Sequence, residues 1–223
     1  MAALVKGGGD AAGAARSVME TGEFDYAWNT PLAPDVIAGM EAAGRGKVSA
    51  AFGTLVERIH VNLTDPSSSL PEGERSTAAH PHPFLSDPAV RKALSMAIDR
   101  ALLVEIGYGT SGQPTCNYVP APEAWASDNT ECLTQDIAGA NALLDEAGWT
   151  MGGNGVREKD GVQLNMVFQT SVNAVRQDFQ ALIKQWWSEI GVQTELKTVD
   201  ASVFFGSDAG SPDTLQKFYA DVE

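Results

Sequence analysis

The chain has 223 residues, 43% of them hydrophobic, and a formal net charge of −14. This length suits one large domain or one and a half ordinary ones, with enough apolar residues for a buried core. The 15 basic residues are scattered singly, which argues against nucleic acid as a partner because phosphate neutralisation needs clustered Lys and Arg. No apolar stretch approaches the roughly 20 residues that cross a membrane, and residues 1–10 do not resemble a signal peptide.

The first part of the chain is predicted to alternate helices and strands. Residues 10–21 form a helix pattern with Asp10 as its N-cap, and residues 24–28 follow with the alternation of a strand. Asp35 is expected to cap a short helix that ends at 43, and a further strand is expected to begin near Val48. Residues 56–64 form a clearer strand pattern, with Ile59, Val61 and Leu63 on its apolar face and Arg58, His60 and Asn62 on its polar face.

The second part continues the alternation after a polar loop at 65–83. Asp87 and Pro88 open a helix predicted to run to 102, whose apolar residues recur every four positions at Val90, Leu94 and Ile98. Further helices are predicted at 136–147 (capped by Asp136) and 173–190, with strands at 162–169 and 192–199. Trp186 fits the apolar stripe of the long helix, whereas Trp187 is expected at its edge. This alternation indicates an α/β fold.

Cys116 and Cys132 bracket a segment rich in Pro, Ser, Asn and Asp, without helical or strand periodicity. A loop with so few core residues gains from covalent closure, and closing about 15 residues stabilises a fold by roughly 3 kcal/mol in the chain-entropy model. We therefore predict a disulfide, which implies an oxidising compartment; two free thiols are the alternative. Metal binding is disfavoured because no His stands at ligand spacing.

Catalytic motifs are missing from the sequence. Neither GxSxG nor HExxH nor a P-loop occurs, and the glycines at 7–9 are not followed by a Lys-Ser/Thr pair. His80 and His82 lie in the segment HPHP, whose prolines favour an extended loop over a metal site. The segment 152–161 lacks the oxygen ligands of a calcium loop. We expect no catalytic residue, no bound metal and no cofactor.

Two side chains have both a structural and a binding interpretation. Trp28 ends a strand beside Asn29, where it either packs into the core or stacks on a ligand at a rim. Arg58 lies in the middle of a strand and needs a carboxylate partner, which either the protein or a ligand supplies.

The segment HPFLSDPAVRKALSMAIDR (82–100) resembles the signature of the peptide/nickel-type (family 5) bacterial extracellular solute-binding proteins. In the order of that family follow ANALLDEAGW (140–149), GVREKDG (155–161) and WWSEIGV (186–192), and SVMETGEFDYAW (17–28) is similar to an upstream unit. The resemblance covers nearly the whole chain. One departure is the turn at 151–154, which lacks the acids of the Asp-Gly-Asp-Gly run that relatives often carry, so a metal at that run has no support here.

The resemblance implies a periplasmic-binding-protein-like α/β fold of two lobes, joined by crossing strands, that close on a ligand. We expect residues 1–54 to be part of the first lobe. Residues 55–223 would form the second lobe, with a mixed sheet and packed helices, truncated at its C-terminus. In relatives the strand that matches Trp28 and the crossing strand that matches Arg58 line the ligand chamber. The expected ligand-binding residues are Trp28, Asn29, Phe52, Arg58 and Asn117.

The implied function is that of the non-enzymatic substrate-binding component of an ABC importer. Such a protein captures peptides or similar small solutes and delivers them to a membrane permease. The implied location is periplasmic or extracytoplasmic, and the implied state is a monomer. The alternative is a ligand-sensing receptor module with the same fold, which a neighbouring kinase or regulator gene would favour over permease and ATPase genes.

Overall fold

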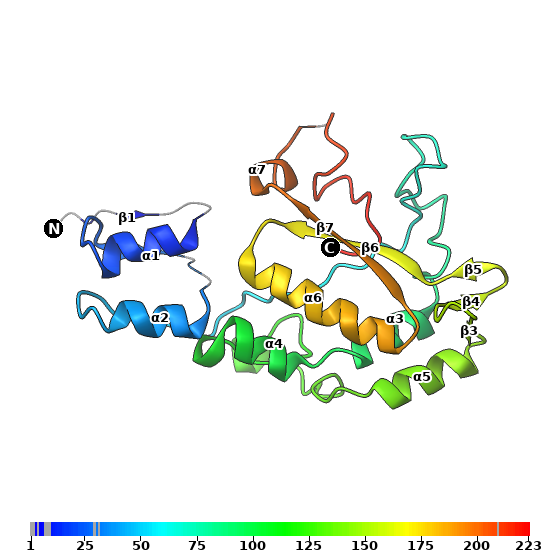
Figure 1. The fold of residues 1–223 in the computed structure, drawn as a ribbon, viewed down its shortest axis with the longest axis horizontal. Coiled ribbons are helices and arrows are strands. Elements are labelled where there is room, and N and C mark those ends of the chain that lie inside the picture. The colour runs from blue at the N-terminus through cyan, green and yellow to red at the C-terminus, as the bar shows by residue number, and fades with distance from the viewer. Residues whose placement is uncertain (1–2, 4, 7–9, 29, 31, 209) are drawn as a thin grey trace. The chain divides into compact units, whose positions relative to one another are not determined.

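The computed structural model describes residues 3, 5–6, 10–28, 30, 32–208 and 210–223. The chain divides into two compact units (Figure 1). The first unit comprises Met1–Val56 and Arg100–Leu133, and the second unit comprises Glu57–Asp99 and Thr134–Glu223. The chain first passes from one unit to the other after Val56, close to the expected lobe boundary after residue 54. The segment 100–133, which was expected in the second lobe, groups instead with the N-terminal part of the chain. The assignment of lobes itself stays a prediction.

The first unit is built from short elements around a small core. Its helices are α1 (Ala11–Met19), α2 (Pro34–Glu41) and α4 (Arg100–Gly107), its 3-10 turns are η1 (Gly109–Ser111) and η2 (Glu123–Trp125), and its strands are β1 (Val5–Lys6) and β2 (Tyr26–Ala27). The strands pair in parallel. Asp10 caps α1 as predicted, because its carboxylate accepts the Gly13 N–H at 2.8 Å. Buried Ala15, Met19 and Met40 join α1 to α2.

Two predictions for this unit are wrong. The cap position of α2 is Ala33, and Pro34 opens the helix because its fixed φ suits the first turn; Asp35 lies inside that turn instead. Residues 46–60, all of which are described, form neither helix nor strand. Val48 instead packs on the α1–α2 core, and its N–H donates to Glu41 Oε1 at 2.8 Å.

The second unit is centred on two parallel strands. β6 (Asn165–Ser171) pairs with β7 (Gln193–Val199) over seven residue pairs, from Asn165↔Gln193 to Ser171↔Val199. The helix α6 (Ala174–Glu189) connects them and lies along one face of the pair (Figure 1). Val222 extends the sheet, since it bridges Phe168 in parallel and Val61 in antiparallel orientation.

Smaller elements complete the second unit. The strands β3 (Thr150–Met151), β4 (Arg157–Lys159) and β5 (Val162–Gln163) form an antiparallel meander, and the helices are α3 (Pro88–Met96), α5 (Ile137–Glu146) and α7 (Ala201–Phe204). Helix α3 packs on α5. The predicted caps Asp87 and Asp136 are confirmed, because their carboxylates accept the N–H groups of Ala89 and Gly139.

The helix predicted over 87–102 is two helices. α3 ends at Met96, and α4 begins at Arg100 in the first unit. The residues Val90, Leu94 and Ile98 are buried, as their spacing predicts, although Ile98 lies beyond the end of α3. The apolar spacing therefore continues past the end of α3, because a four-residue spacing indicates burial and not helical continuity.

Two burial predictions are also wrong. Trp187 is almost fully buried and donates its indole N–H to the Leu94 carbonyl at 3.0 Å, because α6 has the sheet on one side and α3 on the other. In the segment 56–64 the polar Asn62 is buried and the apolar Leu63 is exposed. Asn62 therefore faces the interior, whereas Arg58 and His60 on the same predicted face are exposed.

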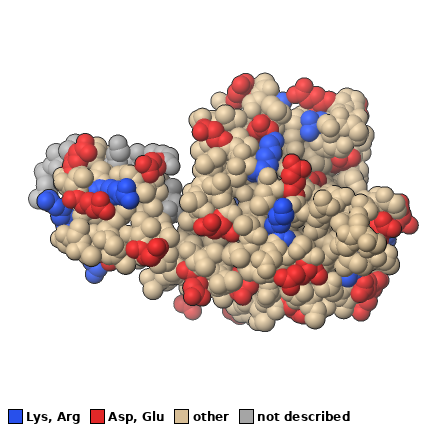
Figure 2. Space-filling view, viewed as in Figure 1, with Lys and Arg blue, Asp and Glu red and all other residues tan. Residues whose placement is uncertain are grey.

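Acidic side chains are dispersed over the face shown in Figure 2, with Lys and Arg between them. On this face the acidic side chains therefore do not gather in one patch. The same face has no continuous basic stripe of the kind that follows a nucleic-acid backbone.

Candidate functional site

Strands β6 and β7 both end at one edge of the sheet, at Ser171 and Val199. The N–H of Val172 donates to the Val199 carbonyl at 2.8 Å, so the pairing of the two segments continues one residue beyond the end of β6. In open α/β sheets, solutes bind outside the carboxyl ends of the strands. This carboxyl edge, where α6 and α7 also begin (Figure 1), is the candidate functional site of the second unit.

An ion pair holds the first residue of the second unit, Glu57, at this edge. Arg176, in the first turn of α6, contacts Glu57 Oε1 through Nε at 2.8 Å and donates from Nη1 to Ser171 Oγ at 3.2 Å. Asn173 caps the helix by accepting the Arg176 N–H at 3.1 Å. Glu57 is the first residue of the second unit. The pair is partly exposed, so it contributes at most about 1 kcal/mol to stability, and its main effect is positional.

Apolar side chains lie at the same edge. Val172, Val203 and Phe205, which we call the edge face, are 56%, 37% and 55% exposed. Phe204, next to Phe205, is buried, and the two rings meet edge to face with centroids 4.9 Å apart. Phe204 is therefore part of the core, whereas Phe205 is exposed and packs against the buried ring of Phe204.

A buried carboxyl group lies near the middle of the sheet. Glu223 Oε1 accepts a hydrogen bond from Gln169 Nε2 at 3.0 Å, whereas Oε2 is buried without a hydrogen-bond partner among the described residues. Burial raises the pKa of Glu223 to about 7, and the Gln169 bond and the Lys197 charge oppose that rise. Near neutral pH this group therefore lies between its protonated and ionised forms.

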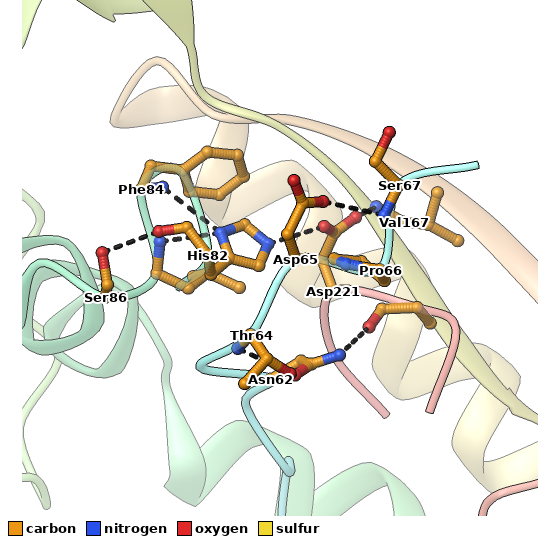
Figure 3. A network of polar contacts seen from close by, with 12 residues as sticks. Asn62, Thr64, Asp65, Pro66, Ser67, His82, Phe84, Ser86, Val167 and Asp221 are labelled. Atoms are coloured by element: carbon orange, nitrogen blue, oxygen red, sulfur yellow. Dashed lines mark hydrogen bonds and ion pairs between the residues drawn. The ribbon is translucent and has the colours of Figure 1, made fainter. Parts of the chain in front are cut away.

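A polar network ties the C-terminal segment to the rest of the unit (Figure 3). Nδ1 of buried His82 accepts the N–H groups of Phe84 and Leu85 at 3.2 and 3.0 Å. Because Nδ1 accepts, Nε2 carries the hydrogen and donates to Asp221 Oδ1 at 2.8 Å. The other oxygen of Asp221 accepts the Val167 N–H at 2.5 Å. His82 thus joins the loop before α3 to β6 through one carboxylate.

Asn62 makes a second tie to the same segment. Its Nδ2 donates to the carbonyls of Phe218 and Ala220 at 2.8 and 3.1 Å, and its Oδ1 accepts from the Thr64 N–H and hydroxyl. These bonds explain why Asn62 is buried: its amide satisfies main-chain groups of a neighbouring segment. The network is therefore part of the scaffold that supports the sheet.

Two open cavities lie near the amino ends of β6 and β7. The larger, of about 380 Å³, is bordered by Lys184, Ser188 and Thr194. The smaller, of about 170 Å³, is bordered by Glu195 and Asp221. Open α/β sheets bind solutes outside the carboxyl ends of their strands, whereas these hollows lie at the amino ends, so the carboxyl edge remains the stronger candidate. Among the described residues, no cluster of three or more His, Cys, Asp or Glu side chains could hold a metal ion.

The expected ligand-binding residues lie in different units. Trp28 and Phe52 are exposed in the first unit, so the core interpretation of Trp28 is wrong. Asn117 is also in the first unit, where its Nδ2 donates to the Ser127 carbonyl at 2.7 Å. Arg58 belongs to the second unit. Asn29 lies outside the described residues. That these residues line one chamber stays a prediction.

Arg58 has a local partner that its sequence context did not reveal. Its Nε–H donates to Nε2 of His60 at 2.6 Å. Burial, and then the Arg58 charge, hold the pKa of His60 below its usual value. The neutral imidazole is therefore the form that accepts this bond.

The predicted disulfide is present between Cys116 and Cys132, whose Cα atoms are 5.7 Å apart. It closes the loop that carries Asn117. The exposed aromatic residues Tyr118 and Trp125 lie in the same loop.

Sequence reasoning missed the residues of the carboxyl edge. Val172 stands between a strand and an N-cap asparagine, which is the pattern of a loop at the carboxyl end of a parallel strand. The paired Phe204 and Phe205 follow the next strand. Both signals were present, but each acquires meaning only when the two strands are known to be neighbours and parallel.

The sequence profile of the bacterial extracellular solute-binding proteins, family 5 Middle, matches residues 5–220. The chain belongs to this family. The resemblance seen at 82–100 is thereby confirmed. The oligopeptide-binding protein OppA of Lactococcus lactis subsp. cremoris (strain SK11) is 42% identical over 117 residues, which are 50% of this chain and 19% of OppA. The chain thus spans about a fifth of the length of this relative.

Solved structures support the same fold. AppA, the oligopeptide-binding protein from Bacillus subtilis in complex with a nonapeptide, covers 96% of this chain with a TM-score of 0.59 and 19% identity, and the match is 38% of AppA. An ABC transporter substrate-binding protein from Sinorhizobium meliloti covers 96% of this chain and 38% of its own, with a TM-score of 0.54 and 25% identity. The periplasmic-binding-protein-like α/β prediction is confirmed. No described helix has the length and apolarity to span a membrane.

Proposed function

We propose that the protein is the substrate-binding component of an ABC import system, which captures peptides or similar small solutes and delivers them to a membrane permease. The family match over residues 5–220 carries the proposal. Oligopeptide binding by the relatives OppA and AppA supports a peptide as the solute. No reactive group is required, because the task is reversible capture.

Capture follows from the physical chemistry of a closing cleft. A solute held between two lobes loses its hydration shell, so a few well-placed polar and aromatic groups determine its affinity. Closure also changes the protein surface, and this change reports occupancy to a partner. On this proposal Trp28 and Phe52 are apolar walls, Asn29 and Asn117 supply amide hydrogen bonds, and Arg58 pairs with a solute carboxylate or with an acid that shapes the chamber.

The disulfide supports a periplasmic or other extracytoplasmic location, since such bonds persist in oxidising compartments. The membrane permease is the protein partner in this proposal. In this proposal the protein acts as a monomer.

Calorimetry on the complete protein tests the proposal, with the solute that co-purifies identified by mass spectrometry. Arg58→Ala and Trp28→Ala should each weaken binding at least about tenfold, which is roughly 1.4 kcal/mol. Lys184→Ala, which removes an exposed cation on α6, is the control and should leave affinity unchanged. Unchanged affinity in both test variants would refute the site assignment. A complete protein that binds no small solute would refute the function.

A further inference from the structure

We propose that the edge face (Val172, Val203 and Phe205) selects an apolar side chain of a peptide ligand. This inference rests on the proposed function and adds a specificity determinant to it. None of these three residues was expected to bind ligand from the sequence.

The exposure of the edge face has no role in folding the described chain. Single exposed apolar residues are ordinary, whereas several at one functional edge indicate a binding surface. Here the three lie on the two connections that leave the carboxyl ends of neighbouring parallel strands, and α7, which contains Val203, contacts β6. Burying such a face against a ligand side chain stabilises the complex, because apolar surface is removed from water.

The edge face is held in place by its surroundings. Asp200 Oδ1 accepts the N–H of Ser202 at 2.8 Å and so caps the turn that carries Val203. The Phe204 carbonyl accepts the N–H of Leu215 at 2.8 Å, which anchors the chain directly before Phe205. A preorganised surface loses little conformational entropy on binding, so its contacts contribute to selectivity between ligands.

Charge at the edge favours an apolar side chain over an acidic one. The guanidinium of Arg176 is engaged by Glu57 and Ser171. The carboxylate of Asp200 lies directly after β7 and would repel a ligand acid. An acidic ligand side chain therefore meets a repulsion here that a neutral apolar side chain does not.

The test uses the complete protein and four probes: trialanine and the three tripeptides in which one alanine is replaced by phenylalanine. Calorimetry on the unaltered protein should show a preference of at least about tenfold for Phe over Ala at one position. Phe205→Ser should reduce that preference at least about fivefold and change the trialanine affinity less than about twofold. Val203→Ser is a second variant on the same face and should act in the same direction.

Met151→Ser is the matched control, since Met151 is 50% exposed but lies on β3 of the meander; it should leave all four affinities unchanged. Equal binding of the four probes by the unaltered protein would overturn the inference and leave peptide capture intact. So would a preference that survives in both edge-face variants. Failure of the unaltered protein to bind any of the probes would instead count against peptides as the solute, and the inference would fall with them.

Discussion

Replacing Arg157 by Met should destabilise the second unit far more than removing its carboxylate partner Asp145. The side chain of Arg157 is 3% exposed and that of Asp145 is 64% exposed. The guanidinium donates from Nε to the Ile190 carbonyl at 3.0 Å and from Nη1 to the Trp149 carbonyl and to Asp145. Nη2 donates to Asn141 Oδ1 at 2.8 Å. One cation thus joins β4 to the middle and the C-terminal end of α5, to the segment after α5 and to the residue that follows α6.

The magnitude follows from which partners lose access to water. Arg157→Met leaves the Trp149 and Ile190 carbonyls without a donor in the interior, and each such group costs about 1–3 kcal/mol. The expected loss in the free energy of unfolding is about 3–5 kcal/mol. Asp145→Asn leaves the carbonyl bonds in place and keeps an amide oxygen that can accept from Nη1, so the buried guanidinium loses a partly exposed counter-charge but no hydrogen bond. That variant should cost no more than about 1 kcal/mol.

Urea unfolding followed by tryptophan fluorescence measures both values. Trp28 and Trp125, which belong to the first unit, are replaced by Phe, so that the remaining tryptophans report on the second unit. Equal losses for the Arg157 and Asp145 variants would show that the ion pair, and not the carbonyl bonds, stabilises this site. A loss below about 1 kcal/mol for Arg157→Met would refute the reasoning altogether.

Three other predictions concern stability and redox state. Leu94→Ala should lower the free energy of unfolding by about 2–5 kcal/mol, because it opens a cavity between α3 and its neighbours; a loss below about 0.5 kcal/mol in urea would contradict the packing. Thiol titration of the denatured, unreduced chain should detect no reactive thiol from Cys116 or Cys132, and two thiols would count against an oxidising compartment. The unfolded chain ionises Glu223 near pH 4.5, whereas the folded chain retains that proton to about pH 7, so stability should fall by at most about 3 kcal/mol as pH rises between these values. Glu223→Gln should remove this part of the pH dependence, and an unchanged slope would show that the buried carboxyl does not cause it.

Most helices of the fold could be predicted from the sequence because their signals are local. The caps Asp10, Asp87 and Asp136 bond to N–H groups two or three residues ahead, so the pattern contains both partners. The disulfide followed from a loop whose composition could not supply a core. The family signature likewise needs no knowledge of contacts.

The candidate site could not be predicted in the same way, because its groups are distant along the chain. Glu57 and Arg176 are separated by 119 positions, and the sequence around either residue does not indicate the other as its partner. The edge face depends on β6 and β7 being parallel neighbours, which places the loops after both strands at one edge. The five residues that the sequence singled out were chosen by resemblance to a ligand chamber, and binding measurements are their test.

Burial shows the same division between local pattern and tertiary contact. The sequence by itself determined that the chain is an α/β protein of the solute-binding family, where most helices begin, and which cysteines bond, because these depend on short-range periodicity, capping and motif order. Only the tertiary structure decided that Asn62 faces inward, since its partners Phe218 and Ala220 lie 156 and 158 positions away. It alone decided that Trp187 is buried, because the Leu94 carbonyl that accepts its N–H is 93 positions away. A polar or aromatic side chain is buried wherever a distant segment satisfies it, and a single strand or helix does not contain that segment.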